Sequence, residues 1–443
     1  MSKDKSGVIC DILIENAQII TMDGDNIVSG CLGVVGDTIV YTGKKHPGIK
    51  GKKTINASGC IVMPGLINAH THSPMSIFRG YADDMELFDW LNSHIWPVEK
   101  EFVTEENVAL ASELSIAEMI RSGTTSFNDM YFYSDITAAV AEKAGIRAIL
   151  GEAVIDVPFP VFKISEDFWK EKAERPVERG LVRSALVAHS PYSCSKKILE
   201  RIREVSEKTG RFIHIHISET DTEVERILTD HGMTPVQYLD SIGLFDCKVA
   251  AVHCVALSDK DIDILAKRKT GVIHCPQSNL KLGSGIARIP EMIKAGITIA
   301  LGTDGQASNN TLDMFAEMKT AALLHKGICK DPSLLQAREV IRMATSNAAS
   351  ILGLKGTGVI AEGNKADIII VDMKSVHNSP LYDPCSHIVY CAKGTDVKTV
   401  IINGKTVMEN GQLLTINEET VKKRVNELSS DIRKFRNSNG RIK

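Results

Sequence analysis

From about residue 65 onward, short apolar segments alternate with helix-like segments, and this alternation constrains the fold more than any other feature of the chain. The intervening helices have polar caps such as Thr104 and end at glycines such as Gly123 and Gly145. Eight strand–helix repeats over roughly 250 residues are typical of a TIM-type (β/α)8 barrel, a fold of the α/β class. The apolar segments that we expect to form its strands are 66–71, 124–129, 146–154, 182–189, 212–218, 249–255, 271–276 and 297–303.

Short β-like segments flank the expected barrel on both sides. They lie at 10–14, 17–21, 31–35, 38–41 and 54–57, and again at 367–371 and 397–402, where Asn403-Gly404 favours a hairpin. Neither group is large enough to be stable alone, so we expect both to form one small β-sandwich. The predicted domains are therefore 1–63 (N-terminal part of the sandwich), 64–355 (barrel) and 356–443 (C-terminal part of the sandwich). The pattern also predicts helices at 334–351 and 418–435.

The composition indicates a globular protein that binds a small molecule. The 443 residues are 43% hydrophobic and carry a formal net charge of -3, which leaves no basic surface for nucleic acid or an anionic membrane. No apolar run approaches the ~18 residues that span a bilayer, and the first twenty residues do not resemble a signal peptide. The ten cysteines form no CxxC pair. We therefore predict a cytoplasmic protein with reduced thiols.

His70 and His72 end the first expected barrel strand. Residues two apart in a strand point to the same side, and the carboxyl ends of barrel strands carry the chemistry of this fold. Two imidazoles at that place are half of a site for zinc or a similar metal. Taken alone, a His-x-His pair fits a surface loop equally well, so the interpretation depends on the other strand ends.

Later strand ends carry residues of the same chemical kind. His216 ends the fifth strand, with His214 expected in a buried layer behind it, and His253 and Asp304 end the sixth and eighth strands. Glu219 follows in the loop after the fifth. Singly, His253 could be a core residue and Glu219 a helix cap. Together the strand ends predict a metal site rich in nitrogen ligands, which can lower the pKa of a bound water from 15.7 to about 7.

The motifs around these residues resemble a known family. PGLINAHTH, HIHISET, AVHCVAL and LGTDGQASNN are similar to motifs of the amidohydrolase superfamily, in its metal-dependent deaminase branch. HTHSPMSIFRGYADDMELFDWL, VAHSPYSCS, PQSNLKLGSGIA and GTDGQASNNTLDMFAEM resemble the 5'-methylthioadenosine/S-adenosylhomocysteine deaminase family, including members that prefer 5'-deoxyadenosine. The resemblance covers essentially the whole chain.

This resemblance implies a hydrolytic deaminase that converts a 5'-modified adenosine to the corresponding inosine with release of ammonia. It implies one divalent metal ion per subunit, Zn2+ or else Fe2+, with four ligands: His70, His72, His216 and Asp304. Asp304 would also accept the proton of the attacking water. Glu219 would protonate a ring nitrogen of adenine, and His253 would hydrogen-bond the attacking oxygen.

The resemblance also implies substrate contacts by Glu99, Trp90 and His189. Glu99 would accept hydrogen bonds from the ribose hydroxyls, although the segment around it also reads as an ordinary amphipathic helix in which Trp90 only packs. His189 ends the fourth strand, where binuclear relatives often carry a bridging lysine. The absence of a lysine there predicts a single metal ion.

The 5' substituent is the least determined feature. An amino-acid tail, as in S-adenosylhomocysteine, needs a partner such as arginine, but Arg147 starts the third strand and Glu152 stands at its rim. We therefore favour 5'-deoxyadenosine or 5'-methylthioadenosine, without excluding S-adenosylhomocysteine or adenosine. The alternatives are a deaminase of a free purine, pyrimidine or triazine ring, and an inactive scaffold of the same fold. We expect a homo-oligomer.

Overall fold

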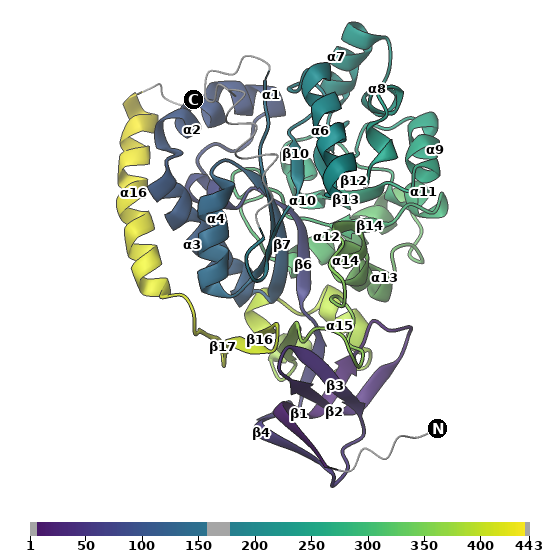
Figure 1. Cartoon of the computed structure of the whole chain (residues 1–443), viewed down its shortest axis with the longest axis vertical. Helices are drawn as coiled ribbons and strands as arrows, with labels where there is room; N and C mark the ends of the chain where they lie inside the picture. The colour runs from purple at the N-terminus through teal and green to yellow at the C-terminus, as the bar shows by residue number, and fades with distance from the viewer. Residues whose placement is uncertain (1–6, 157–177, 439–443) are drawn as a thin grey trace. The chain divides into compact units, whose positions relative to one another are not determined.

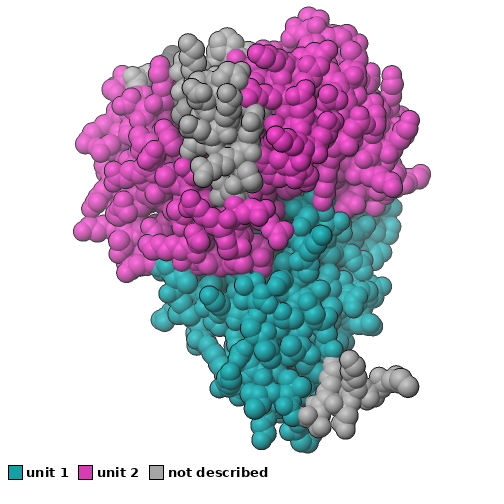
Figure 2. Space-filling model, viewed as in Figure 1, with its two compact units in different colours: residues 1–68, 118–126, 313–416 teal, residues 69–117, 127–312, 417–443 magenta. Residues whose placement is uncertain are grey.

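The computed structural model describes residues 7–156 and 178–438. Two compact units make up the chain and are coloured separately in Figure 2. Unit 1 consists of residues 1–68, 118–126 and 313–416, and unit 2 of residues 69–117, 127–312 and 417–443.

Unit 1 contains a nine-stranded sheet to which both ends of the chain contribute, as the sequence predicts. The N-terminal β5 pairs antiparallel with the C-terminal β15 and so joins the two groups of strands. The segments expected at 10–14 and 17–21 form one strand, with an irregularity between Ile14 and Ala17. The strands are β1 Val8–Ile20, β2 Ile27–Val35, β3 Thr38–Gly43, β4 Ile49–Asn56, β5 Cys60–Pro64, β15 Ile368–Asp372, β16 Val397–Ile402, β17 Lys405–Glu409 and β18 Gln412–Leu413.

The helix expected at 334–351 is wrong, because the structure has two short helices in its place. Thr345 lies between them with φ -139° and ψ -97°, and its hydroxyl donates to the Ile341 carbonyl at 2.6 Å. This side-chain hydrogen bond competes with the backbone hydrogen bonds of a continuous helix and favours a break. The helices of this unit are α12 Met314–Cys329, α13 Ala337–Met343, α14 Ser346–Leu352, α15 Pro384–Tyr390, η5 Val376–Asn378 and η6 Gly394–Asp396.

The eight expected barrel strands are present and lie in two sheets, of four and five strands. The segment expected at 182–189 is interrupted at Ala185, so that its halves pair with different neighbours: Ala185 N–H donates to Leu150 and Leu186 N–H to Phe212. Pairing is parallel from β8 to β9 and from β10 through β14. The strands are β6 Leu66–Thr71, β7 Thr124–Tyr131, β8 Arg147–Glu152, β9 Val182–Ser184, β10 Leu186–Ala188, β11 Ile213–Ile217, β12 Val249–His253, β13 Gly271–His274 and β14 Ile299–Leu301.

Helices follow these strands along the chain (Figure 1). Their ends obey the sequence signals: Ser195 caps α6 through the Ile198 N–H, and Gly210 ends it with φ 70°. The terminal helix α16 is also confirmed and buries Val421 and Ile432. The helices are α3 Glu105–Arg121, α4 Ser134–Ala144, α6 Lys196–Thr209, α7 Asp221–His231, α8 Pro235–Ser241, η4 Leu244–Asp246, α9 Asp259–Lys267, α10 Pro276–Lys281, α11 Ile289–Lys294 and α16 Glu418–Ser438.

The long segment after β6 is helical, but it is not one regular α-helix. It runs through η1 Ser73–Phe78, α1 Leu87–Asp89, the π-helical η2 Trp90–Ile95 and α2 Trp96–Phe102. Its buried apolar residues join a core cluster that includes Phe78, Met130 and Ile432. A π-helical turn is rare and is frequently found at functional sites.

Among the described residues, no helix is both long and apolar enough to cross a membrane. All ten cysteines are free thiols.

Candidate active site

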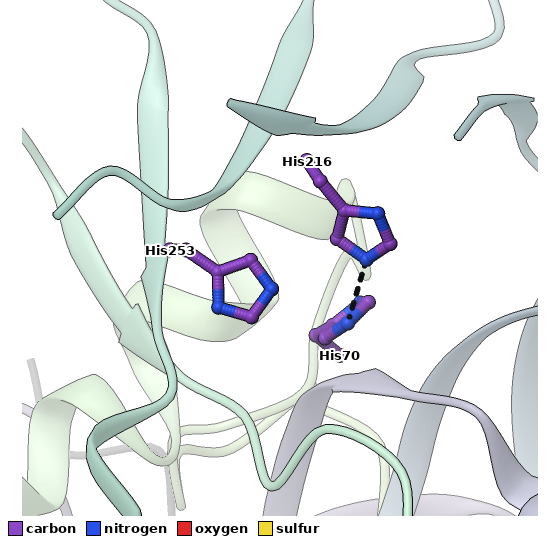
Figure 3. A group of neighbouring side chains, drawn as sticks. All are labelled: His70, His216 and His253. Atoms are coloured by element: carbon purple, nitrogen blue, oxygen red, sulfur yellow. Dashed lines mark hydrogen bonds between the residues drawn. The ribbon is translucent and has the colours of Figure 1, made fainter. Parts of the chain in front are cut away.

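The predicted ligands come together in unit 2. His70 Nε2 and His72 Nε2 lie 3.1 and 3.2 Å from Asp304 Oδ1. His216 Nε2 lies 3.2 Å from His70 Nε2, and His253 stands beside them on the neighbouring strand (Figure 3). Strand ends that are far apart in the sequence thus form two close groups of possible ligand atoms that share His70: one with His72 and Asp304, the other with His216 and His253.

This donor set fits a divalent metal ion. Burial lowers the pKa of His70 to about 3 and that of His216 well below its usual value, so both rings are neutral, as metal ligands must be. Burial also lowers the pKa of His72, but the hydrogen bond and charge of Asp304 outweigh it and raise that pKa to about 9. An ion bound between His72 and Asp304 would therefore displace the ring proton of His72. Ligand atoms around a tetrahedral zinc ion are about 3.3 Å apart, given bonds of about 2.0–2.1 Å. The observed separations match that spacing.

The other ring nitrogens of His70 and His72 have partners of their own. His70 Nδ1 lies 2.9 Å from His214 Nε2, and His72 Nδ1 donates to the Met130 carbonyl at 2.5 Å. His214 is fully buried, as expected for a second layer. Such contacts fix the orientation of a ligand and set which ring nitrogen faces the ion.

The two oxygens of Asp304 have separate partners. Oδ1 faces the histidines, whereas Oδ2 accepts hydrogen bonds from Ser278 at 2.6 Å and Ser308 at 2.9 Å. Ser278 was not singled out by the sequence analysis, although its place in the PQSN motif just after β13 could have indicated it. The two hydroxyls leave Oδ1 directed at the cluster.

The local backbone explains how Asp304 reaches this position. Asp304 is left-handed, with φ 64°, and its N–H donates to the His70 carbonyl at 3.0 Å. Gly302 lies so close to β6 that a Cβ there would come within 2.8 Å of the His70 nitrogen. A glycine two residues before the aspartate therefore permits the close approach that puts the carboxylate beside the histidines.

Glu219 and His253 form a second pair beside the cluster, with Oε2 and Nε2 3.6 Å apart. Burial, followed by the charge of Asp304, raises the pKa of Glu219 to about 8. Glu219 is therefore protonated at neutral pH and can act as a general acid. The Asn279 amide donates to His253 Nδ1 at 3.2 Å, which leaves the ring proton on Nε2. Neither Asn279 nor its role was expected from the sequence.

Glu219 and His253 line a pocket that Glu99, Trp90 and His189 also line. The Tyr131 hydroxyl donates to Glu99 Oε1 at 2.6 Å, and burial raises the pKa of Glu99 to about 7. The Trp90 indole N–H donates to the Ala82 carbonyl, so Trp90 can contact a ligand only through the face or edge of its ring. The three predicted substrate contacts thus line the same pocket as the predicted metal ligands His72, His216 and Asp304. Tyr131 was missed by the sequence analysis.

The rest of the pocket wall is mainly apolar. Among the described residues that line it there is no lysine or arginine; the apolar members include Leu87, Leu91, Ile95, Trp96, Phe132 and Ile155. Glu152 is not in the lining, because its carboxylate accepts hydrogen bonds from the backbone of Tyr133 and Ser134 at the start of α4. Arg226 lies over the Tyr192 ring, 5.7 Å from its centre, and is not part of the lining.

Comparison with known proteins places this site in a family. A model of the amidohydrolase family matches residues 61–407. A 5-methylthioadenosine/S-adenosylhomocysteine deaminase of Syntrophobacter fumaroxidans is 41% identical, covering 96% of this chain and 98% of its own. A 5'-deoxyadenosine deaminase of Methanosarcina acetivorans is 44% identical, covering 93% of this chain and 96% of its own.

Solved structures agree with this placement. A crystal structure of an adenosine deaminase from Xanthomonas campestris, with bound zinc, has a TM-score of 0.93 and 34% identity and covers 97% of this chain and all of that one. An atrazine chlorohydrolase from Arthrobacter aurescens, at 24% identity and a TM-score of 0.87 over 94% of this chain and 100% of its own, shares the fold. The family match over most of the chain and the two curated relatives show that this chain belongs to the amidohydrolase family.

Proposed function

We propose that this chain is a metal-dependent hydrolytic deaminase that converts a 5'-modified adenosine to the corresponding inosine and ammonia. The observation that carries the proposal is the buried Glu219 beside His253 and the His/Asp cluster, in a pocket that Glu99 also lines. Burial and the charge of Asp304 raise the pKa of Glu219 to about 8, as a proton donor requires. The names of the curated relatives, deaminases of 5-methylthioadenosine, S-adenosylhomocysteine and 5'-deoxyadenosine, support the same chemistry.

We infer that the four-stranded and five-stranded sheets are consecutive parts of one (β/α)8 barrel. Two contacts support this inference. Ala185, just before β10 of the five-stranded sheet, donates its N–H to Leu150 in β8 of the four-stranded sheet, and Asp304, after β14, donates its N–H to the His70 carbonyl in β6. With the domain boundaries proposed from the sequence, the barrel occupies 64–355 and a β-sandwich is built from 1–63 and 356–443. A cytoplasmic location and homo-oligomeric assembly stay predictions.

One divalent ion would be held by His70, His72, His216 and Asp304, whose facing atoms lie 3.1–3.2 Å from one another along the chain of contacts through His70 and Asp304. The zinc in the Xanthomonas relative makes Zn2+ the first candidate. When bound, the ion supplies acidity to a water molecule and so makes it nucleophilic near neutral pH. His253 stays outside the ligand set in this proposal, because its Nδ1 faces the Asn279 amide nitrogen, an arrangement that suits a ring with its proton on Nε2.

The side chains then divide the proton transfers. Glu219 donates its proton to N1 of the adenine ring, which makes C6 electrophilic, and Asp304 accepts a proton from the water that adds to C6. His253 donates its Nε2 hydrogen bond to the incoming oxygen. Asp304 then passes the proton of the water to the amino group, so that the C6–N bond breaks and ammonia leaves. The remaining O–H proton returns to Glu219, which leaves the C6 carbonyl of inosine with a proton on N1.

Glu99 accepts hydrogen bonds from the two ribose hydroxyls in this proposal. Its Oε1 already accepts from Tyr131, which holds the carboxylate in place with lone pairs left for the substrate. His189, whose Nδ1 lies 2.8 Å from the Ser193 hydroxyl, contributes its other ring nitrogen to the substrate side. A free base would make no use of Glu99, so a nucleoside explains this residue better.

The apolar wall favours an uncharged 5' substituent. A tail carrying a carboxylate and an ammonium group would lose its hydration against Leu87, Leu91 and Phe132 without gaining a charged partner in the described lining. We therefore propose 5'-deoxyadenosine or 5'-methylthioadenosine as the preferred substrate.

The test is the release of ammonia from four compounds: 5'-deoxyadenosine, 5'-methylthioadenosine, S-adenosylhomocysteine and adenine. The deaminated product is an inosine derivative from each nucleoside and hypoxanthine from adenine. We expect kcat/KM for the first two to exceed that for S-adenosylhomocysteine by about tenfold or more, and adenine to be used worst. A preference for the charged tail would contradict the proposed 5' group, and the absence of deamination would contradict the function. Arg226→Ala is the control, and it should lower none of the values for the neutral nucleosides.

A further inference from the structure

The turn that carries Glu219, residues 217–220, has an unusual backbone. Ser218 is left-handed, with φ 52°, although it has a side chain, and it is fully buried. Residues other than glycine adopt this conformation only where neighbouring groups hold them in it. A neighbouring group must therefore hold this turn in its conformation.

Glu223, in the first turn of α7, supplies two of the bonds. Its Oε1 accepts from the Ser218 N–H at 3.0 Å and its Oε2 from the Glu219 N–H at 2.8 Å. The side chain is 1% exposed. Thr220, the cap of α7, accepts from the Glu223 N–H at 3.2 Å, so the turn and the helix start hold each other.

This arrangement differs from ordinary helix capping. In a capping box, the acidic residue three positions after the cap bonds back to the N–H of the cap residue itself, which here is Thr220. Glu223 instead reaches past Thr220 to the two preceding N–H groups. Its carboxylate therefore fixes the peptide units on both sides of Ser218, and with them the Cα from which the Glu219 side chain projects.

The same turn is tied to the strand that carries His253. The Ser218 carbonyl accepts from the N–H groups of Val255 and Ala256, at 3.0 and 2.9 Å. These follow His253 and Cys254, which are both left-handed, with φ 69° and 50°. The Ser218 peptide is thus the junction between the two chain segments that deliver Glu219 and His253.

We propose that Glu223 is a positioning residue that sets the placement of Glu219 against His253, and that it affects turnover only through Glu219. This inference rests on the proposed function, because it assigns Glu223 a role in the same proton transfer. Glu223 itself is not in the pocket lining.

The first measurement compares Glu223→Gln with wild type. An amide keeps one acceptor oxygen but turns a donor toward the second N–H, so the turn loses one bond and gains a repulsive contact. We expect kcat to fall by about 10- to 100-fold with KM changed less than threefold and the metal content unchanged. Glu225→Gln, on the exposed side of the same helix, is the matched control and should leave kcat unchanged.

The decisive measurement is a double-mutant cycle with Glu219→Gln. If Glu223 acts only through Glu219, adding Glu223→Gln to Glu219→Gln lowers the residual activity no further. A second loss that multiplies with the first would overturn the proposal, as would a Glu223→Gln enzyme with wild-type kcat. If Glu223→Gln fails to fold, as judged by circular dichroism, Glu223→Asp is used in the same cycle, because its shorter side chain withdraws both acceptors. Failure of the proposed function is distinct, since wild type itself would then release no ammonia.

Discussion

Glu99 and Glu219 are buried carboxyl groups in one pocket, yet they have different partners. Burial raises the pKa of both, to about 7 for Glu99 and about 8 for Glu219. The Tyr131 hydrogen bond lowers the pKa of Glu99, whereas the charge of Asp304 raises that of Glu219 further. Near neutral pH Glu219 therefore keeps its proton while Glu99 is partly ionised. Such a difference suits one carboxyl group to proton donation and the other to accepting hydrogen bonds.

The ribose role of Glu99 predicts a pH-dependent KM. The ionised carboxylate accepts hydrogen bonds best, so KM should fall as pH rises through about 7, where Glu99 loses its proton. Glu99→Gln should raise KM by about 10- to 100-fold, in line with the roughly 1.5–3 kcal/mol of hydrogen bonds to charged groups. It should also remove this pH dependence. Steady-state kinetics between pH 5.5 and 9, run on both enzymes, measure the effect.

Tyr131→Phe is the matched variant for this prediction. Loss of the hydroxyl removes a bond that favours ionised Glu99, so the change in KM should move to higher pH rather than vanish. An unaltered KM profile in both variants would show that Glu99 does not bind the substrate.

At the residue scale, the sequence located the side chains that end strands but not those that support them. His70, His216 and Asp304 were predicted because a barrel brings strand ends together. Tyr131, Ser278 and Asn279 make their contacts with residues at least 26 positions away, through side-chain orientations that no spacing rule gives. Glu152 shows a related case: the sequence places it at the rim of the third strand, as an acidic group that disfavours a carboxylate tail, whereas its carboxylate accepts hydrogen bonds from the backbone at the start of α4.

At the scale of elements, the approach of β14 to β6 depends on Gly302. A Cβ at this position would lie 2.8 Å from His70 N and 3.0 Å from His70 O, so backbone would have to move. We predict that Gly302→Ala destabilises the protein by about 1–3 kcal/mol, the usual cost of overpacking. It should also weaken zinc binding by about 10- to 100-fold, as changes behind a ligand do. Thermal unfolding and a zinc competition titration measure the two effects.

Gly327→Ala is the comparison for this prediction. Gly327 lies on the exposed side of α12, and a Cβ there meets nothing within 4 Å. Alanine should therefore stabilise the helix by about 0.5–1 kcal/mol and leave zinc binding unchanged. Equal stability of Gly302→Ala and wild type, with unchanged zinc affinity, would contradict the importance of close strand approach at the site.

The strands were predictable because their apolar runs are long enough to stand out and glycines mark their ends. Helices were harder to predict where a side chain competes for the backbone hydrogen bonds of the helix. Thr345 breaks the helix expected at 334–351, and the Trp90–Ile95 turn is π-helical although its apolar spacing suits an ordinary helix. Periodicity reports which face is buried and does not distinguish these variants.

For the molecule as a whole, both ends of the chain contribute to one sheet, as the sequence predicts, and all four proposed ligands belong to unit 2. The compact units differ from the sequence-based boundaries at 63/64 and 355/356, because residues 313–416 form one unit with the N-terminal strands. Hydrophobic patterning marks where elements begin, but which elements pack together depends on contacts between residues far apart in the chain. Those boundaries remain a proposal.

The central claim is that Glu219 donates the proton in a metal-dependent deamination. Glu219→Gln keeps the shape of the side chain but removes its acidic proton, and Asp304→Ala removes a proposed ligand. The most direct measurement is ammonia release from 5'-deoxyadenosine together with zinc content for both variants and wild type. We predict that Glu219→Gln loses about a thousandfold or more of the activity with full zinc content, and that Asp304→Ala loses both. Near-normal turnover in Glu219→Gln would contradict the account.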